Sequence, residues 1–188
     1  MLKQYPMLTD EELMARIQNG DRQCFEELYD RYHKRLFNFI FRLVNDREKA
    51  EDFLHDVFIK VMESHDRFDV TRKFSTWIYT IAINLCRNEM RNQLNRKQLI
   101  ALNFIPDFIS PAIQNENIDK RNFKHELNKL IGEMDEENKT ILLLRFHEEL
   151  SIPQISSIVG LAEGTVKSRL FYLLKKMANQ LSVYNPTN

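Results

Sequence analysis

Cysteine, glycine and proline are scarce in this chain of 188 residues, which contains two, four and five of them respectively. Two separated cysteines, Cys24 and Cys86, supply neither a disulfide framework nor the ligand set of a structural zinc site, so we expect buried thiols in a reducing cytosol. The sequence has no apolar run that could span a bilayer and no basic-then-apolar leader at its start. These absences predict a soluble, cytoplasmic protein without direct membrane insertion.

Residue patterns for catalysis are also missing. The five histidines are scattered, and Asp52 and His55 form a close acid–histidine pair on a predicted helix face. One such pair is more often solvated surface than a metal site. The sequence contains neither a glycine-rich phosphate loop nor a nucleophile elbow. We therefore expect no catalytic activity, no metal and no cofactor.

The chain also lacks a formal net charge, because 27 basic residues balance 27 acidic ones, but these charges are segregated. Residues 71–97 contain six basic and one acidic residue, and residues 163–188 contain four and one. Residues 1–70 and 98–162 each have a balance of −4. Two compact basic blocks in acidic surroundings indicate two separate nucleic-acid contacts. Chance clustering is a credible alternative for either block alone.

Helical patterns run through the sequence. All four glycines fall at predicted helix boundaries, no proline needs to lie inside a helix, and convincing strand alternation is absent. We therefore predict an all-α fold with two small helical domains at residues 1–97 and 118–188. The linker between them, 98–117, loses helical periodicity and contains Pro106 and Pro111. It is too apolar for an idle tether, so we expect it to dock on these domains or on a partner.

The predicted helix at residues 46–64 has a surplus of apolar surface. Four large side chains cannot all point inward together: Phe53, Leu54, Phe58 and Met62. The other side of the helix is acidic and includes Glu51, Asp52 and Asp56. This combination fits a protein-docking surface, and a broad core stripe with a solvated edge is the alternative.

The first basic block combines a loop at residues 68–73 with a helix from residue 74 to about residue 93. We expect this helix to bury Phe74, Trp77, Ile78, Ile81, Ala82 and Leu85. The opposite side has a row of hydrogen-bond donors: Asn84, Arg87, Asn88, Arg91 and Asn95. Cations beside aromatic rings suit single-stranded nucleic acid, because bases stack on the rings while phosphates are neutralised. We interpret Phe74 and Trp77 as core residues, and the loop cations and the donor row as the contact surface.

Residues 150–180 carry the strongest pattern in the chain. Pro153 suits the first turn of a short helix, Gly160 permits the left-handed turn that ends it, and Glu163 suits the start of a second helix. We expect the second helix to bury Val166, Leu170, Leu173, Leu174 and Met177. This spacing is typical of a helix-turn-helix, whose second helix reads the DNA major groove. An ordinary helical hairpin is the weaker alternative.

Three motifs follow one another along the chain. They are Asp46-x-x-x-Ala50-Glu51-Asp52 running on to Asp56-Val57-Phe58, then Phe74-x-x-Trp77-Ile78-Tyr79-x-Ile81-Ala82-x-Asn84, then Gly164-Thr165-Val166-Lys167-Ser168-Arg169-Leu170. In this order and spacing the chain resembles, over nearly its whole length, the extracytoplasmic-function (ECF) sigma factors of bacterial RNA polymerase. These keep only regions two and four of the sigma-70 family.

The resemblance implies an alternative sigma factor that directs promoter-specific transcription initiation, and it assigns roles to residues. Core polymerase, through its β′ clamp helices, would contact Asp46, Glu51, Asp52, Asp56 and Phe58; the β flap would be a second contact. Flipped bases and phosphates of the minus-ten strand would contact Val70, Thr71, Arg72, Lys73, Asn84, Arg87 and Arg91. The minus-thirty-five duplex would contact Thr165, Lys167, Ser168, Arg169 and Phe171, with Arg169 on the backbone.

The sequence departs from the family pattern at three positions. Tyr172 stands where many relatives have arginine, Ala162 where a capping residue is common, and Thr71 where an acidic residue is frequent. The family also implies an anti-sigma factor as a partner, although no residue identifies it.

A response-regulator effector is the alternative interpretation, because the third motif recurs in such proteins. An effector of this kind would bind duplex DNA without being a polymerase subunit. It would have an upstream receiver or sensor domain, usually with strands, whereas the N-terminal half of this chain is predicted to be helical.

Overall fold

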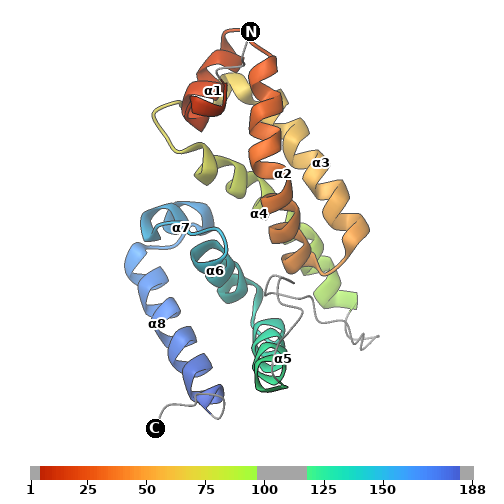
Figure 1. The fold of residues 1–188 in the computed structure, drawn as a ribbon, viewed down its shortest axis with the longest axis vertical. Coiled ribbons are helices and arrows are strands. Elements are labelled where there is room, and N and C mark those ends of the chain that lie inside the picture. Colours follow the sequence, from red (N-terminus) through yellow and green to blue (C-terminus); the bar gives the residue numbers. More distant parts are fainter. Residues whose placement is uncertain (1–4, 97–117, 183–188) are drawn as a thin grey trace. The chain divides into compact units, whose positions relative to one another are not determined.

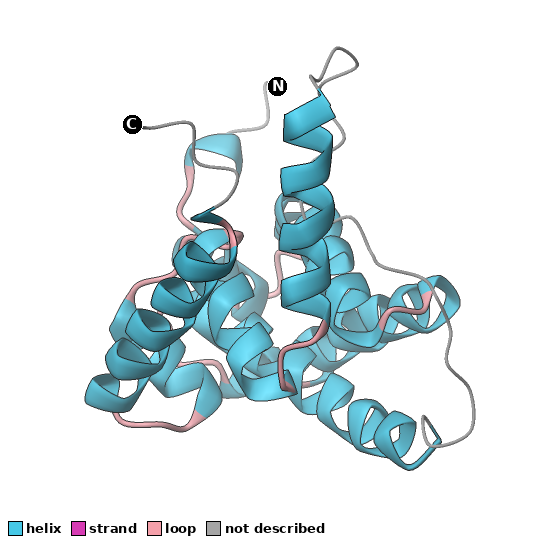
Figure 2. Ribbon diagram, turned by 90° about the horizontal axis from the view of Figure 1, so that it is seen from below, coloured by secondary structure: helices cyan, strands magenta, loops and turns pink. Residues whose placement is uncertain are grey.

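The computed structural model describes residues 5–96 and 118–182, and every regular element in these two ranges is a helix (Figure 1 and Figure 2). The all-α prediction is therefore confirmed for the described part of the chain. Contacts divide the chain into two compact units, Met1–Gln98 and Leu99–Asn188. The predicted linker at 98–117 lies outside the described residues. Within the described ranges, no helix has both the length and the apolar character needed to cross a membrane.

The N-terminal unit is built from four α-helices and two short 3-10 helices. These are η1 (Tyr5–Met7), α1 (Asp10–Gln18), α2 (Gln23–Val44), α3 (Arg47–Glu63), η2 (His65–Arg67) and α4 (Phe74–Arg96). Helices α2 and α3 lie side by side, and α4 packs against both (Figure 1). The break between α2 and α3 is sharp because Asn45 adopts a left-handed φ of 55° and Asp46 then caps α3, accepting the Lys49 N–H at 3.2 Å.

Apolar side chains, most of them large, fill the core of this unit and come from all four α-helices. Among those with almost no exposure are Leu13, Met14, Leu28, Leu36, Phe39, Ile40, Ala50, Val57, Phe74, Ile78 and Ala82. Cys24 and Cys86 are also buried, as predicted. Burial of each large apolar side chain stabilises the fold by roughly 1.5–3 kcal/mol relative to its exposure.

The predicted buried stripe of α4 is right along its centre and wrong along one edge. Its centre is buried, but Trp77, Ile81 and Leu85 are only half-buried. Instead, Tyr79 and Ile83 complete the buried face. The ring of Tyr79 meets Phe39 of α2 edge to face, with centroids 5.1 Å apart, and this contact turns that edge of α4 toward the core.

The C-terminal unit consists of α5 (Ile118–Gly132), α6 (Glu136–Phe146), α7 (Ile152–Val159) and α8 (Glu163–Gln180). Helices α7 and α8 form the predicted helix-turn-helix. Pro153 lies in the first turn of α7, and Gly160 ends that helix with a left-handed φ of 76°. Helix α8 buries Val166, Leu170 and Leu173. Leu174, which we predicted to be buried, is 42% exposed. The helical spacing places it at the edge of the face that Val166, Leu170 and Leu173 form.

Candidate nucleic-acid interface

Helix α1 holds both ends of the loop between η2 and α4. At the start of the loop, Gln18 Nε2 donates to the carbonyl of Phe68 at 2.8 Å. At its end, the Glu11 carboxylate accepts the backbone N–H of Phe74 at 3.0 Å and lies 3.6 Å from Lys73 Nζ. Glu11 therefore caps the first turn of α4, where the unpaired N–H groups and the helix dipole favour a negative charge.

The tip of this loop faces solvent. Its exposed side chains are those of Val70, Thr71, Arg72 and Lys73. Asp69 organises the turn, because its carboxylate accepts the hydroxyl and N–H of Thr71 at 2.6 and 3.0 Å and lies 3.4 Å from Arg72 Nε. The hydrogen bonds from Thr71, followed by the charge of Arg72, lower the pKa of Asp69 below its usual value. The loop thus offers one apolar side chain, Val70, and two cations.

The aromatic residues beside the loop belong mainly to the core. Phe68 and Phe74 are 5% and 0% exposed, and their rings meet edge to face at 5.8 Å. Trp77 is half-buried, with its ring centroid 5.0 Å from that of Phe68. The core interpretation is therefore right for Phe74, whereas Trp77 is only half-buried.

The polar row on α4 is described in part. Asn84 is exposed and Arg87 is half-buried, three residues apart on one side of the helix. The side chains of Asn88, Arg91 and Asn95 lie outside the described residues.

Helix α3 presents an acidic face to solvent. Glu51, Asp52 and Asp56 are exposed there, and Ile59, at 41% exposure, adds an apolar side chain. Phe58, expected on this face from the family resemblance, lies in the core at 5% exposure. The rings of Phe25 and Tyr29 from α2 cover it, at centroid distances of 6.0 and 4.7 Å. Asp46 serves as the N-cap of the helix.

The first half of α8 exposes the polar residues of the third motif. Thr165, Lys167 and Ser168 all face solvent. The Ser168 hydroxyl donates to the carbonyl of Gly164 at 2.9 Å, so its hydrogen is used within the helix and its lone pairs remain available as acceptors. Lys167 Nζ lies 3.8 Å from the Glu163 carboxylate one turn earlier.

Two aromatic rings follow on the same helix. Phe171 and Tyr172 are 61% and 67% exposed, and their rings contact each other edge to face. Both lie in solvent although the hydrophobic core of this unit is close by. The buried residues of α8 are Val166, Leu170 and Leu173 instead.

Arg169 points away from this surface, toward α6. Its Nη1 donates to the Glu137 carboxylate, and the two side chains are 33% and 41% exposed. The resemblance placed Arg169 on the DNA backbone, but in this structure its charge is paired within the protein. Arg169 therefore joins the two helices.

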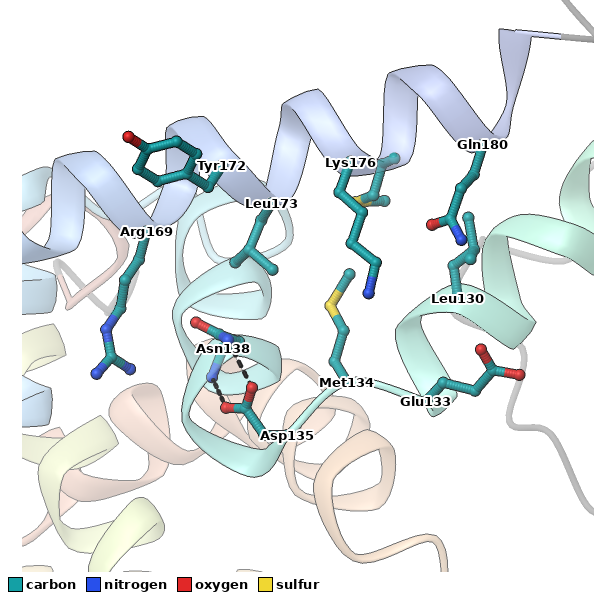
Figure 3. Close-up of a pocket in the computed structure, with 11 residues that line it drawn as sticks. Leu130, Glu133, Met134, Asp135, Asn138, Arg169, Tyr172, Leu173, Lys176 and Gln180 are labelled. Carbon is teal, nitrogen blue, oxygen red and sulfur yellow. Dashed lines mark hydrogen bonds between the residues drawn. The ribbon is translucent and has the colours of Figure 1, made fainter.

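A groove of about 300 Å³ lies within the C-terminal unit, between the end of α5, the start of α6 and α8 (Figure 3). Its apolar lining includes Leu130, Met134 and Leu173, and charged side chains of Glu133 and Lys176 flank it. No local sequence pattern indicated this groove. Within the described ranges, no group of three or more histidine, cysteine, aspartate and glutamate side chains is placed to hold a metal ion.

The sequence matches the family models for "Sigma-70 region 2" over residues 28–96 and "Sigma-70, region 4" over residues 124–177. It is 26% identical over 176 residues to the ECF RNA polymerase sigma factor SigW of Bacillus subtilis (strain 168), which covers 89% of this chain and 94% of that protein. It is 29% identical over 190 residues to the ECF RNA polymerase sigma-E factor of Escherichia coli (strain K12), with 93% and 95% covered.

Solved structures show the same fold. CnrH, in complex with the cytosolic domain of CnrY, has a TM-score of 0.66 at 20% identity and covers 93% of this chain and 97% of that one. The sigma factor RpoE of Bartonella quintana, in complex with the anti-sigma factor NepR, has a TM-score of 0.67 at 23% identity, with 85% and 97% covered. The response-regulator interpretation finds no support among these relatives. The first matched region includes α4 and the loop before it, and the second includes the helix-turn-helix. The chain therefore belongs to the ECF sigma factors, the alternative sigma subunits with regions two and four that direct transcription initiation.

Proposed function

We propose that this sigma factor divides promoter recognition between its two units while α3 binds core RNA polymerase. Residues 1–97 would bind the polymerase and capture the minus-ten strand, and residues 118–188 would read the minus-thirty-five duplex, with 98–117 linking them. The observation that carries this proposal is that each unit has its own exposed cations: Arg72 and Lys73 lie in the loop before α4, and Lys167 lies on α8. Each of these surfaces can attract DNA, whereas the acidic face of α3 would repel it.

For the polymerase contact we propose the exposed acidic face of α3. Glu51, Asp52 and Asp56 would meet basic side chains of the β′ clamp helices, and Ile59 would supply apolar contact area. We do not include Phe58, because the rings of α2 cover it. Asp46 would act indirectly, by fixing the start of the helix.

For the minus-ten contact we propose the loop tip and the donor row of α4. Unpairing a base costs a few kcal/mol, which stacking and phosphate contacts must offset. Val70 and Thr71 would contact a flipped base, while Arg72 and Lys73 would hold phosphates. Further along α4, the proposed contacts are Asn84, Arg87 and Arg91. The hydrogen bonds from Gln18 and Glu11 of α1 to the two ends of the loop support this assignment, because a loop held at both ends loses less conformational entropy on binding.

For the minus-thirty-five contact we propose Thr165, Lys167, Ser168 and Phe171 of α8. Lys167 and Ser168 can hydrogen-bond to base edges in the major groove. Arg169, through its ion pair with Glu137, would set the angle of α8 on α6 and leave the DNA backbone to other cations.

We also propose an anti-sigma factor as a partner, since both similar structures are complexes with a second protein, and one of them joins a sigma factor to an anti-sigma factor. The acidic face of α3 and the groove beside α8 would be the surfaces it shares with core polymerase, the groove matching the expected β flap contact. The chain would act in the cytoplasm, where the polymerase is.

Reconstitution with core polymerase tests the proposal directly. We expect run-off transcripts from a library of genomic fragments, and no transcripts from core polymerase alone. Asp52→Lys combined with Asp56→Lys should abolish core binding without loss of helix content, because it reverses two charges on one face. The control, Asp30→Lys with Asp66→Lys, makes the same charge change at two other exposed positions and should bind normally. Equal affinity of both double variants for core polymerase would locate the docking surface elsewhere.

A further inference from the structure

Two adjacent aromatic side chains stand in solvent on α8, although large rings are usually well buried in a folded domain. Phe171 is 61% exposed and Tyr172 is 67% exposed. Their centroids are 5.5 Å apart and their planes are inclined by 76°. This edge-to-face contact restricts both rings, so the pair forms an apolar surface that is already ordered before a partner arrives.

Helical spacing places Phe171 between two exposed lysines of α8, Lys167 and Lys175. It follows Ser168 by three residues and Lys167 by four, and it precedes Lys175 by four, so these side chains share one face of the helix. Lys167, Ser168 and Lys175 are all exposed. A ring with a lysine one turn before it and another one turn after it fits an anionic partner that also offers an apolar group. Lys167 lies 3.8 Å from Glu163 in an exposed pair, which contributes little and can be exchanged for a phosphate or a base edge.

A DNA major groove offers such an apolar group. Base edges there present hydrogen-bond donors, acceptors and the C5-methyl group of thymine. Phenylalanine has neither donor nor acceptor, so the thymine methyl is the one group it can select. Bases inside a duplex are stacked on each other, which leaves no free face for a ring to stack on. On the basis of the proposed function, we propose that Phe171 selects thymine in the minus-thirty-five duplex through its methyl group, and that Tyr172 positions the Phe171 ring.

Burial of one methyl group changes affinity by about fourfold. The test uses the full chain assembled with core polymerase, and a promoter duplex that this holoenzyme selects from a library randomised in the minus-thirty-five region. Each thymine of the selected element is replaced in turn by deoxyuridine, which lacks only the methyl group. We expect replacement of one particular thymine to weaken binding of the wild-type holoenzyme by about fourfold.

Variants of α8 then assign the effect to its residue. Phe171→Ser should make binding insensitive to that methyl group, and Tyr172→Ala should reduce the methyl effect. Tyr172→Phe keeps the ring contact and should retain the whole effect. Leu174→Ser is the matched control, since Leu174 is an exposed apolar residue of the same helix at 42% exposure, and the methyl effect should be unchanged.

Four results would overturn the inference. A wild-type holoenzyme that selects a promoter yet ignores every methyl group would overturn it and leave the proposed function intact. Persistence of the methyl effect in Phe171→Ser would also overturn the inference and leave the proposed function intact. Loss of core polymerase binding in Phe171→Ser would show that the two rings contact the polymerase instead of DNA. A holoenzyme that selects no duplex contradicts the proposed function itself, and this inference with it.

Discussion

The ion pair between Arg169 and Glu137 separates two roles that the same guanidinium can have in a DNA-binding helix. If Arg169 holds a phosphate, removing its charge removes one counterion-releasing contact. If it holds α8 against α6, the same change weakens the unit and leaves the salt dependence of DNA binding alone. We predict the second outcome, because the guanidinium donates to the Glu137 carboxylate and lies on the side of α8 that faces α6.

The expected energy follows from the exposure of the pair. The Arg169 and Glu137 side chains are 33% and 41% exposed, so water screens their attraction in part. Pairs in such surroundings contribute at most about 1 kcal/mol. Arg169→Gln should therefore lower the free energy of unfolding of the C-terminal unit by up to about 1 kcal/mol. Charge exchange, Arg169→Glu with Glu137→Arg, should restore most of this loss, because the ion pair forms again in the opposite direction.

Salt dependence of promoter binding gives the second measurement. The slope of log affinity against log salt changes by about 1 for each phosphate contact that is lost. We expect Arg169→Gln to leave the slope of the holoenzyme unchanged. Lys167→Gln, the comparison on the exposed face, should weaken promoter binding because it removes a proposed base contact. A smaller slope in Arg169→Gln, together with failure of the charge exchange to restore binding, would refute the positioning role and place Arg169 on the DNA backbone.

Two further predictions concern the ends of helices. Glu11→Ala removes the cap of α4 and one of the two hydrogen bonds by which α1 holds the loop before α4. We expect faster hydrogen exchange at the first amides of α4, a loss of about 1 kcal/mol in stability, and slower open-complex formation. Unchanged exchange at those amides would contradict the capping role. Gly160→Ala places a β-carbon at a φ of 76° and should destabilise the C-terminal unit by about 1–2 kcal/mol in thermal unfolding. Gly164→Ala is its control, because Gly164 lies in the first turn of α8 with open space around it and should not be destabilised.

Much of the fold could be predicted from residue chemistry that acts locally. The first turn of α7 at Pro153, the end of α7 at Gly160 and the start of α8 at Glu163 all appear in the structure, because each depends on side chains or φ values within a few residues. The edges of buried stripes were less predictable. Apolar residues flank the centre of α4 on both sides, and periodicity alone cannot choose between Ile81 and Ile83. The contact of Tyr79 with Phe39 on another helix decides it.

Residues that position the site could not be predicted from the sequence. Glu11 reaches Phe74 across 63 residues, and Glu137 reaches Arg169 across 32. Each is an ordinary acidic residue in the first turn of its own helix, where an acid is already explained by the helix dipole. Phe58 shows the same limit in reverse, because rings from α2 cover a residue that helical spacing alone left open.

Four cations that the resemblance assigned to DNA face a carboxylate of this chain. Arg72 lies 3.4 Å from Asp69, Lys73 lies 3.6 Å from Glu11, and Lys167 lies 3.8 Å from Glu163, while Arg169 pairs with Glu137. The first three pairs are largely exposed on the cation's side, and such pairs contribute little, so a phosphate can replace the carboxylate at small cost. Until that exchange occurs, these carboxylates reduce the positive field of both surfaces. Non-specific attraction to DNA by the free sigma factor should therefore be weak, and binding should become strong where core polymerase holds both surfaces against one promoter at the same time.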